Sequence, residues 1–81
     1  MKQSIEKLNN KFEALKEKFS NDEIILVFAE FEIKDLLLES EIMLRKELSK
    51  NERKLVKSLN NQMKEFNQLI QDLSNNSSVS I

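Results

Sequence analysis

The sequence predicts an all-α protein, a three-helix antiparallel bundle of up-down-up topology with coiled-coil-like heptad packing that forms oligomers. Three observations support this fold class. The 81 residues include no glycine and no proline, where average usage would give roughly five or six of the first and about four of the second. Leucine, glutamate and lysine are the most frequent residues, which is typical of long helices. Apolar residues also recur at spacings of three and four in three successive segments.

One helical domain accounts for most of the chain. We expect it to cover residues 1–74, with helices at about 3–19, 21–48 and 50–74, followed by a disordered polar tail at 75–81. So short a chain buries only about 60 to 65% of the surface that its unfolded form exposes. Cysteine and histidine are absent, so disulfides and Cys/His zinc sites cannot add stability. Association with another chain would supply the missing burial.

The first predicted helix has one narrow apolar stripe. Its members are Ile5, Leu8, Phe12, Leu15 and Phe19. After it, Ser20 and Glu23 fit a capping box, in which the serine oxygen and the glutamate carboxylate each accept a free backbone N–H at a helix start. A second helix is therefore expected from about residue 21.

The second predicted helix is apolar on more than one side. At about 100° per residue its apolar side chains fall into three stripes. These are Ile24, Phe28, Phe31, Leu38 and Ile42; Leu26, Ile33, Leu37, Leu44 and Leu48; and Ile25, Leu36 and Met43. The two flanking helices can cover two stripes, which leaves Ile25, Leu36 and Met43 as the predicted protein-binding residues. A strand is the competing interpretation of 27–33, but no second strand-like segment exists to pair with it.

The third predicted helix repeats the pattern of the first. Its stripe consists of Val56, Leu59, Met63, Phe66, Ile70 and Leu73. Ser49 and Glu52 form a second capping box, which places a helix start at about residue 50. The alternative is a helical hairpin with one long helix from 22 to 74, because the seam beginning at Ile24 stays in the same heptad frame up to Val56. The polar seam residues at 45, 49 and 52 favour the break.

The residue types argue against catalysis. Without histidine, cysteine or glycine, the usual bases, thiolates and oxyanion turns are missing, so we expect no enzyme and no cofactor. Glu32, Asp35 and Glu39 share one helix face. The Glu-x-x-Asp pattern of Glu32 and Asp35 resembles half of the magnesium site of all-α nucleoside triphosphate pyrophosphohydrolases, and that resemblance implies a metal-dependent hydrolase. The second Glu-x-x-Asp pattern of the family is missing here.

Charge is segregated along the chain. Residues 19–41 carry seven acidic side chains and one lysine, whereas 42–57 carry six basic and two acidic ones. An antiparallel bundle would gather the basic residues at one end, joined by Lys2 and Lys7. The candidate phosphate-binding residues are Arg45, Lys46, Lys50, Arg53, Lys54 and Lys57. The alternative function is therefore a nucleic-acid-binding accessory protein, although no aromatic residue lies between Arg45 and Lys57 to stack on bases.

These observations favour a small non-enzymatic helical protein that acts through protein–protein interaction, as an adaptor, an inhibitor or an antitoxin- or immunity-like regulator. The expected partners are a second copy, as a homodimer or higher oligomer, and another protein. We expect no membrane partner, because charged residues interrupt the most apolar segment. The longest apolar run in the first twenty residues is Ala14-Leu15, so no secretory signal is predicted and a cytoplasmic location is expected.

Overall fold

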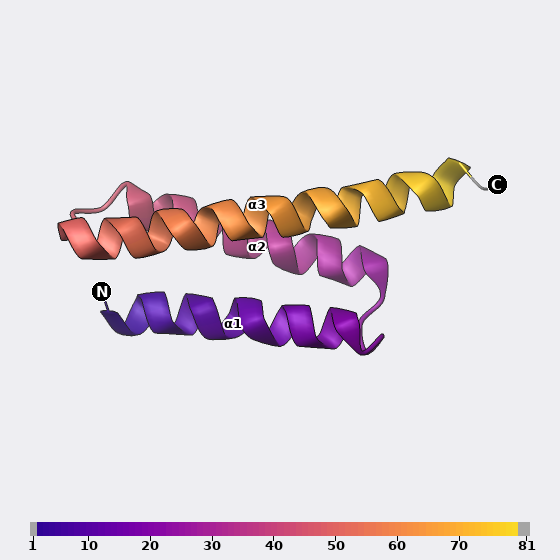
Figure 1. The fold of residues 1–81 in the computed structure, drawn as a ribbon, viewed down its shortest axis with the longest axis horizontal. Helices are drawn as coiled ribbons and strands as arrows, with labels where there is room; N and C mark the ends of the chain where they lie inside the picture. The colour runs from indigo at the N-terminus through magenta and orange to yellow at the C-terminus, as the bar shows by residue number, and fades with distance from the viewer. Residues whose placement is uncertain (1, 80–81) are drawn as a thin grey trace.

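The described part of the protein consists of three helices, each antiparallel to the next (Figure 1). The computed structural model describes the backbone of residues 2–79 and the side chains of residues 4–75. The helices are α1 (Lys2–Ser20), α2 (Leu26–Leu44) and α3 (Lys50–Val79), and no strand occurs among residues 2–79. They run up, down and up, so the start of α1, the end of α2 and the start of α3 share one end of the bundle (Figure 1). The predicted all-α bundle is confirmed, and the single long helix from 22 to 74 is wrong.

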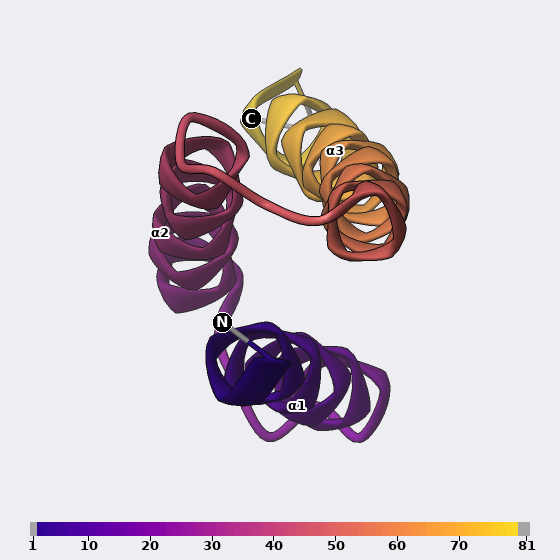
Figure 2. The same cartoon turned by 90° about the vertical axis from the view of Figure 1, so that its left-hand side faces the viewer.

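The helices occupy the corners of a triangle when the bundle is viewed from its end (Figure 2). α3 packs more extensively against α2 than against α1. The buried apolar side chains between them come from all three helices. They are Ile5, Leu8, Phe12, Leu15, Ala29, Ile33, Leu36, Val56, Leu59, Met63 and Ile70. Phe66 of α3 joins α1 through edge-to-face contacts with Phe12 and Phe19, with ring centroids 5.8 and 5.4 Å apart.

The turn after α1 replaces the first predicted capping box. Asp22 takes a left-handed conformation with φ of 57°. Its N–H donates to the Phe19 carbonyl at 3.3 Å, and the Glu23 N–H donates to the Lys18 carbonyl at 2.8 Å. This is a Schellman motif with aspartate at the position that usually holds glycine. Ser20 and Glu23 therefore end α1 instead of starting α2.

α2 is shorter than the predicted helix 21–48 at both ends. Its N-cap is Ile25, whose extended backbone carries no side-chain capping bond. At the other end the Arg45 and Lys46 N–H groups donate to the carbonyls of Ile42 and Met43, both at 3.1 Å, and helix geometry stops after Leu44. The shortening follows from the two turns, because the Schellman motif occupies residues that were expected to be helical.

The second capping box is present. The Ser49 N–H donates to Glu52 Oε1 at 2.9 Å, and the Glu52 N–H donates to Ser49 Oγ at 3.2 Å. The backbone N–H of Ser49, and then its side chain, hold the pKa of the Glu52 carboxyl below its ordinary value. α3 begins at Lys50, as the motif predicts. It continues to Val79, past the predicted end at 74, because no glycine or proline stops it; residues 80 and 81 of the predicted tail lie outside the described residues.

A buried polar pair fixes how α2 and α3 align. Asn60 Nδ2 donates to Ser40 Oγ at 2.7 Å, and Ser40 Oγ donates to the Leu37 carbonyl at 2.7 Å. Both side chains are buried. A shift of α3 along α2 would separate the amide from the hydroxyl and leave the buried Asn60 amide without this acceptor, so the pair favours one register.

Candidate protein-binding face

α2 has an apolar face that no part of the described chain covers. Five of its large side chains are between 43% and 63% exposed. They are Val27, Phe28, Phe31, Leu38 and Ile42, and we call them the outer face of α2. At about 100° and 1.5 Å per residue they fall within an arc of about 100° and span about 22 Å. The opposite side of the same helix is buried in the core through Ala29, Ile33, Leu36 and Ser40.

The structure corrects the predicted binding stripe. Leu36 is only 6% exposed and lies in the core. Met43 is half-buried against the core, while Ile25 is exposed at the N-cap, outside the helix. The error has a physical cause: the core side of α2 includes Ala29 and Ser40, small side chains that allow close helix approach but do not stand out in an apolar pattern. The 4, 3, 4 spacing of Ala29, Ile33, Leu36 and Ser40 was the missed signal.

Acidic residues flank the outer face. α2 carries five acidic residues and one basic residue, Lys34, for a net charge of −4. Only Glu39 among these acids forms an ion pair within the described part of the chain, with Lys11 Nζ 3.2 Å from its Oε1. Four acidic side chains beside the outer face therefore have no basic partner there. They are Glu30, Glu32, Asp35 and Glu41.

The acidic residues of α2 do not form a metal site. Glu32, Asp35 and Glu39 line a pocket between α1 and α2, and Lys11 and Lys18 line the same pocket. Across the side chains that the structure describes, no three acidic, histidine or cysteine groups lie close enough together to hold a metal ion. Glu32 and Asp35, which match the Glu-x-x-Asp pattern of the pyrophosphohydrolases, are thus not part of such a group of three.

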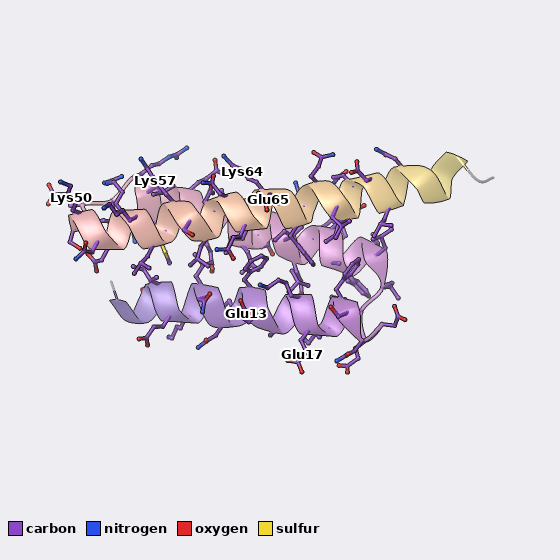
Figure 3. The ribbon with its side chains drawn as sticks, viewed as in Figure 1. Glu13, Glu17, Lys50, Lys57, Lys64 and Glu65 are labelled. Carbon is purple, nitrogen blue, oxygen red and sulfur yellow. The ribbon has the colours of Figure 1, made fainter. Side chains whose placement is uncertain are left out.

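The predicted basic residues lie at one end of the bundle but on different surfaces. Lys50 and Lys57, with Lys64 further along, point outward from α3, away from α1 (Figure 3). Lys46 instead lines a pocket between α1 and α2 that Lys7 also lines. Arg45 and Lys54 are exposed, and the side chain of Lys2 lies outside the described ones. Among the described side chains, Lys46 therefore lies on a different surface from Lys50 and Lys57.

Arg53 has a structural role. Its Nη1 donates to the Leu44 carbonyl at 3.0 Å and its Nη2 donates to the Lys46 carbonyl at 3.3 Å. These carbonyls stand at the C-terminal end of α2, where backbone acceptors have no partner within the helix and a positive charge is favourable. Sequence reasoning included Arg53 among the phosphate-binding candidates because it could not show this capping contact.

Replacing Arg53 should therefore weaken the fold. We expect Arg53→Ala to lower the free energy of unfolding by about 1 to 2 kcal/mol, because two charge-assisted hydrogen bonds are lost at a partly exposed position. Urea unfolding followed by circular dichroism measures the change. Lys54→Ala, at the neighbouring exposed position, is the matched control and should stay within about 0.5 kcal/mol of the wild type. Equal effects of the two substitutions would contradict the capping role.

A smaller apolar surface lies between α1 and α3. Ile5 and Leu59 form part of a shallow groove, with Leu55 at its edge. Leu55 is about as exposed as the residues of the outer face, and Leu69 and Leu73 of α3 are also exposed, but the groove also contains Glu6, Asn9, Ser58 and Gln62. Leu55 therefore provides a control position for tests of the outer face.

No protein family model, curated protein or solved structure matches the chain. None of the helices within residues 2–79 combines the length and the apolar character that crossing a bilayer requires.

Proposed function

We propose that this chain is a non-enzymatic helical protein that binds other protein chains through the outer face of α2, as an adaptor, an inhibitor or an antitoxin- or immunity-like regulator. One observation carries the proposal: five large apolar side chains are exposed in a single stripe. Scattered apolar residues are normal on a protein surface, but an apolar stripe with a polar border is typical of interaction sites, and here the stripe is interrupted only at Asp35. The partner would bury this stripe.

The spacing of the outer face suits a helical partner. Phe31 follows Val27 by four residues, Leu38 follows Phe31 by seven, and Ile42 follows Leu38 by four. Such positions lie one above the other on a helix and accept the side chains of a second helix in coiled-coil-like packing. Docking of an amphipathic helix against an apolar helical surface is a common mode of peptide recognition.

The energy available from the outer face is moderate. Fully burying a large apolar side chain contributes about 1.5 to 3 kcal/mol, and the five residues are already about half-buried. About 1 kcal/mol each therefore remains, or about 5 kcal/mol from this side of an interface and a similar amount from the partner. Association costs about 4 to 15 kcal/mol, so apolar burial alone would support only weak binding.

Photo-crosslinking in the native host tests the proposal. Phe31 is replaced by a photoreactive phenylalanine analogue, and the same analogue is placed at the exposed Leu55 as a control. We expect protein adducts from position 31 and few from position 55, because only the outer face is covered by a partner. The mass of the adduct distinguishes a second copy from another protein. Adducts at position 55 without adducts at position 31 would refute binding through this face.

A further inference from the structure

We propose that the partner of the outer face is an amphipathic helix whose apolar stripe is bordered by lysine or arginine side chains. This inference rests on the proposed function and names the chemistry of the partner. Its basis is the charge around the outer face, where α2 has a net charge of −4 although the whole chain has only −1. Lys11 and Lys18 of α1 lie near part of this charge, in the pocket with Glu32, Asp35 and Glu39, whereas Lys50, Lys57 and Lys64 point outward from α3 (Figure 3).

Glu32, Glu30 and Glu41 border the outer face on its two sides, and Asp35 lies within its arc. At about 100° per residue, Asp35 and Glu32 fall on one side of Phe31, and Glu41 and Glu30 fall on the other. A helix docked along the stripe would place its own bordering residues next to these carboxylates, as the flanking positions of a coiled coil do. Basic residues there would form ion pairs, and each exposed pair strengthens binding by up to about fivefold.

The two phenylalanines of the outer face support the same partner. Phe28 and Phe31 have more than half of their surface exposed. The negatively polarised face of an aromatic ring attracts a lysine ammonium or an arginine guanidinium. The same chain already contains such a contact, with Lys16 Nζ 4.6 Å from the centre of the Phe12 ring. Basic side chains of the partner helix would thus be attracted both by the acidic side chains of α2 and by the two phenylalanine rings.

A second copy fits the outer face less well. In a two-fold symmetric antiparallel pair, each flank of one helix meets the same flank of the other. The flank that carries Glu32, Asp35 and Glu39 would face its own copy, and like charges at such positions destabilise a pair. Lys11 and Lys18 of α1 line the pocket beside this flank and could offset part of the repulsion, whereas Lys34 of α2 lies on the opposite flank. The charges therefore favour a partner of opposite sign.

Two synthetic helical peptides test the inference on the full-length protein. Both have the same leucine stripe; one is bordered by lysine and the other by glutamate. Fluorescence anisotropy measures their binding at low and high salt. We expect the lysine-bordered peptide to bind at least tenfold more tightly at low salt, and we expect this preference to shrink at high salt as the charges are screened. Asp35→Lys combined with Glu41→Lys should remove the preference.

Substitutions in the stripe separate this inference from the proposed function. Leu38→Asp should abolish binding of the lysine-bordered peptide, whereas Leu55→Asp should bind it like the wild type. If both peptides bind the wild type equally and Leu38→Asp abolishes this binding, the charge preference is refuted but binding through the outer face is not. Binding that Leu38→Asp does not change would refute both. The proposal of a basic partner helix is refuted if neither peptide binds. It is also refuted if light scattering shows a wild-type dimer that Leu38→Asp converts to monomers.

Discussion

Leu36→Asp is expected to unfold the protein. Leu36 is 6% exposed and packs in the core that the three helices share. No basic side chain is buried with it, so a carboxylate there would lose its hydration without gaining a partner, at a cost of several kcal/mol. A domain of this size has a total stability of only about 4 to 12 kcal/mol. The substitution should thus remove most of the helical signal in far-ultraviolet circular dichroism.

Leu38→Asp is the matched control, two residues away on the same helix. Leu38 lies on the outer face and is 58% exposed, so its replacement keeps a carboxylate in water. We expect helix content and urea midpoint close to those of the wild type. A folded Leu36→Asp variant together with an unfolded Leu38→Asp variant would show that α2 is rotated relative to this structure.

Phe12→Ala should have the second large effect on stability. Phe12 is 1% exposed, and its ring packs edge-to-face against Phe66, which links α1 to α3. Removing a buried phenylalanine ring costs about 3 to 5 kcal/mol, because the site loses its contacts and retains a cavity. For a domain of this size such a loss lowers the thermal midpoint by about 15 to 30 °C. Differential scanning calorimetry measures the shift.

Phe28→Ala is the control that removes a phenylalanine from the surface instead of from the core. Phe28 lies on the outer face and does not belong to the core cluster. Its replacement should change the free energy of unfolding by less than about 1 kcal/mol. Similar midpoints for Phe12→Ala and Phe28→Ala would mean that the aromatic contact between α1 and α3 does not stabilise the fold.

The sequence was sufficient to orient α1 and α3. Each has a single apolar stripe, so only one rotation of the helix can bury it. Ile5, Leu8, Phe12 and Leu15 of α1 are all buried, and so are Val56, Leu59, Met63 and Ile70 of α3. The start of α3 was equally predictable, since the Ser49–Glu52 capping box is a local interaction that its two residues specify.

The sequence was not sufficient to orient α2. A helix with apolar residues on several sides can bury more than one of them, so periodicity does not select the core side. The choice depends on contacts with other helices, namely the space left by Ala29 and the hydrogen bond between Ser40 and Asn60. The turn at Asp22 was hidden for a related reason, because the chain has no glycine to mark a left-handed residue.

The two loops of the bundle, residues 21–25 and 45–49, also affect how fast the chain folds. Because each loop has only five residues, the helices it joins meet soon after they form, and proteins dominated by such local contacts fold in about microseconds to milliseconds. No proline is present to add a slow isomerisation step. During folding, the core side and the outer face of α2 are therefore exposed at the same time only briefly. This limits aggregation through α2, which is the most apolar of the three helices.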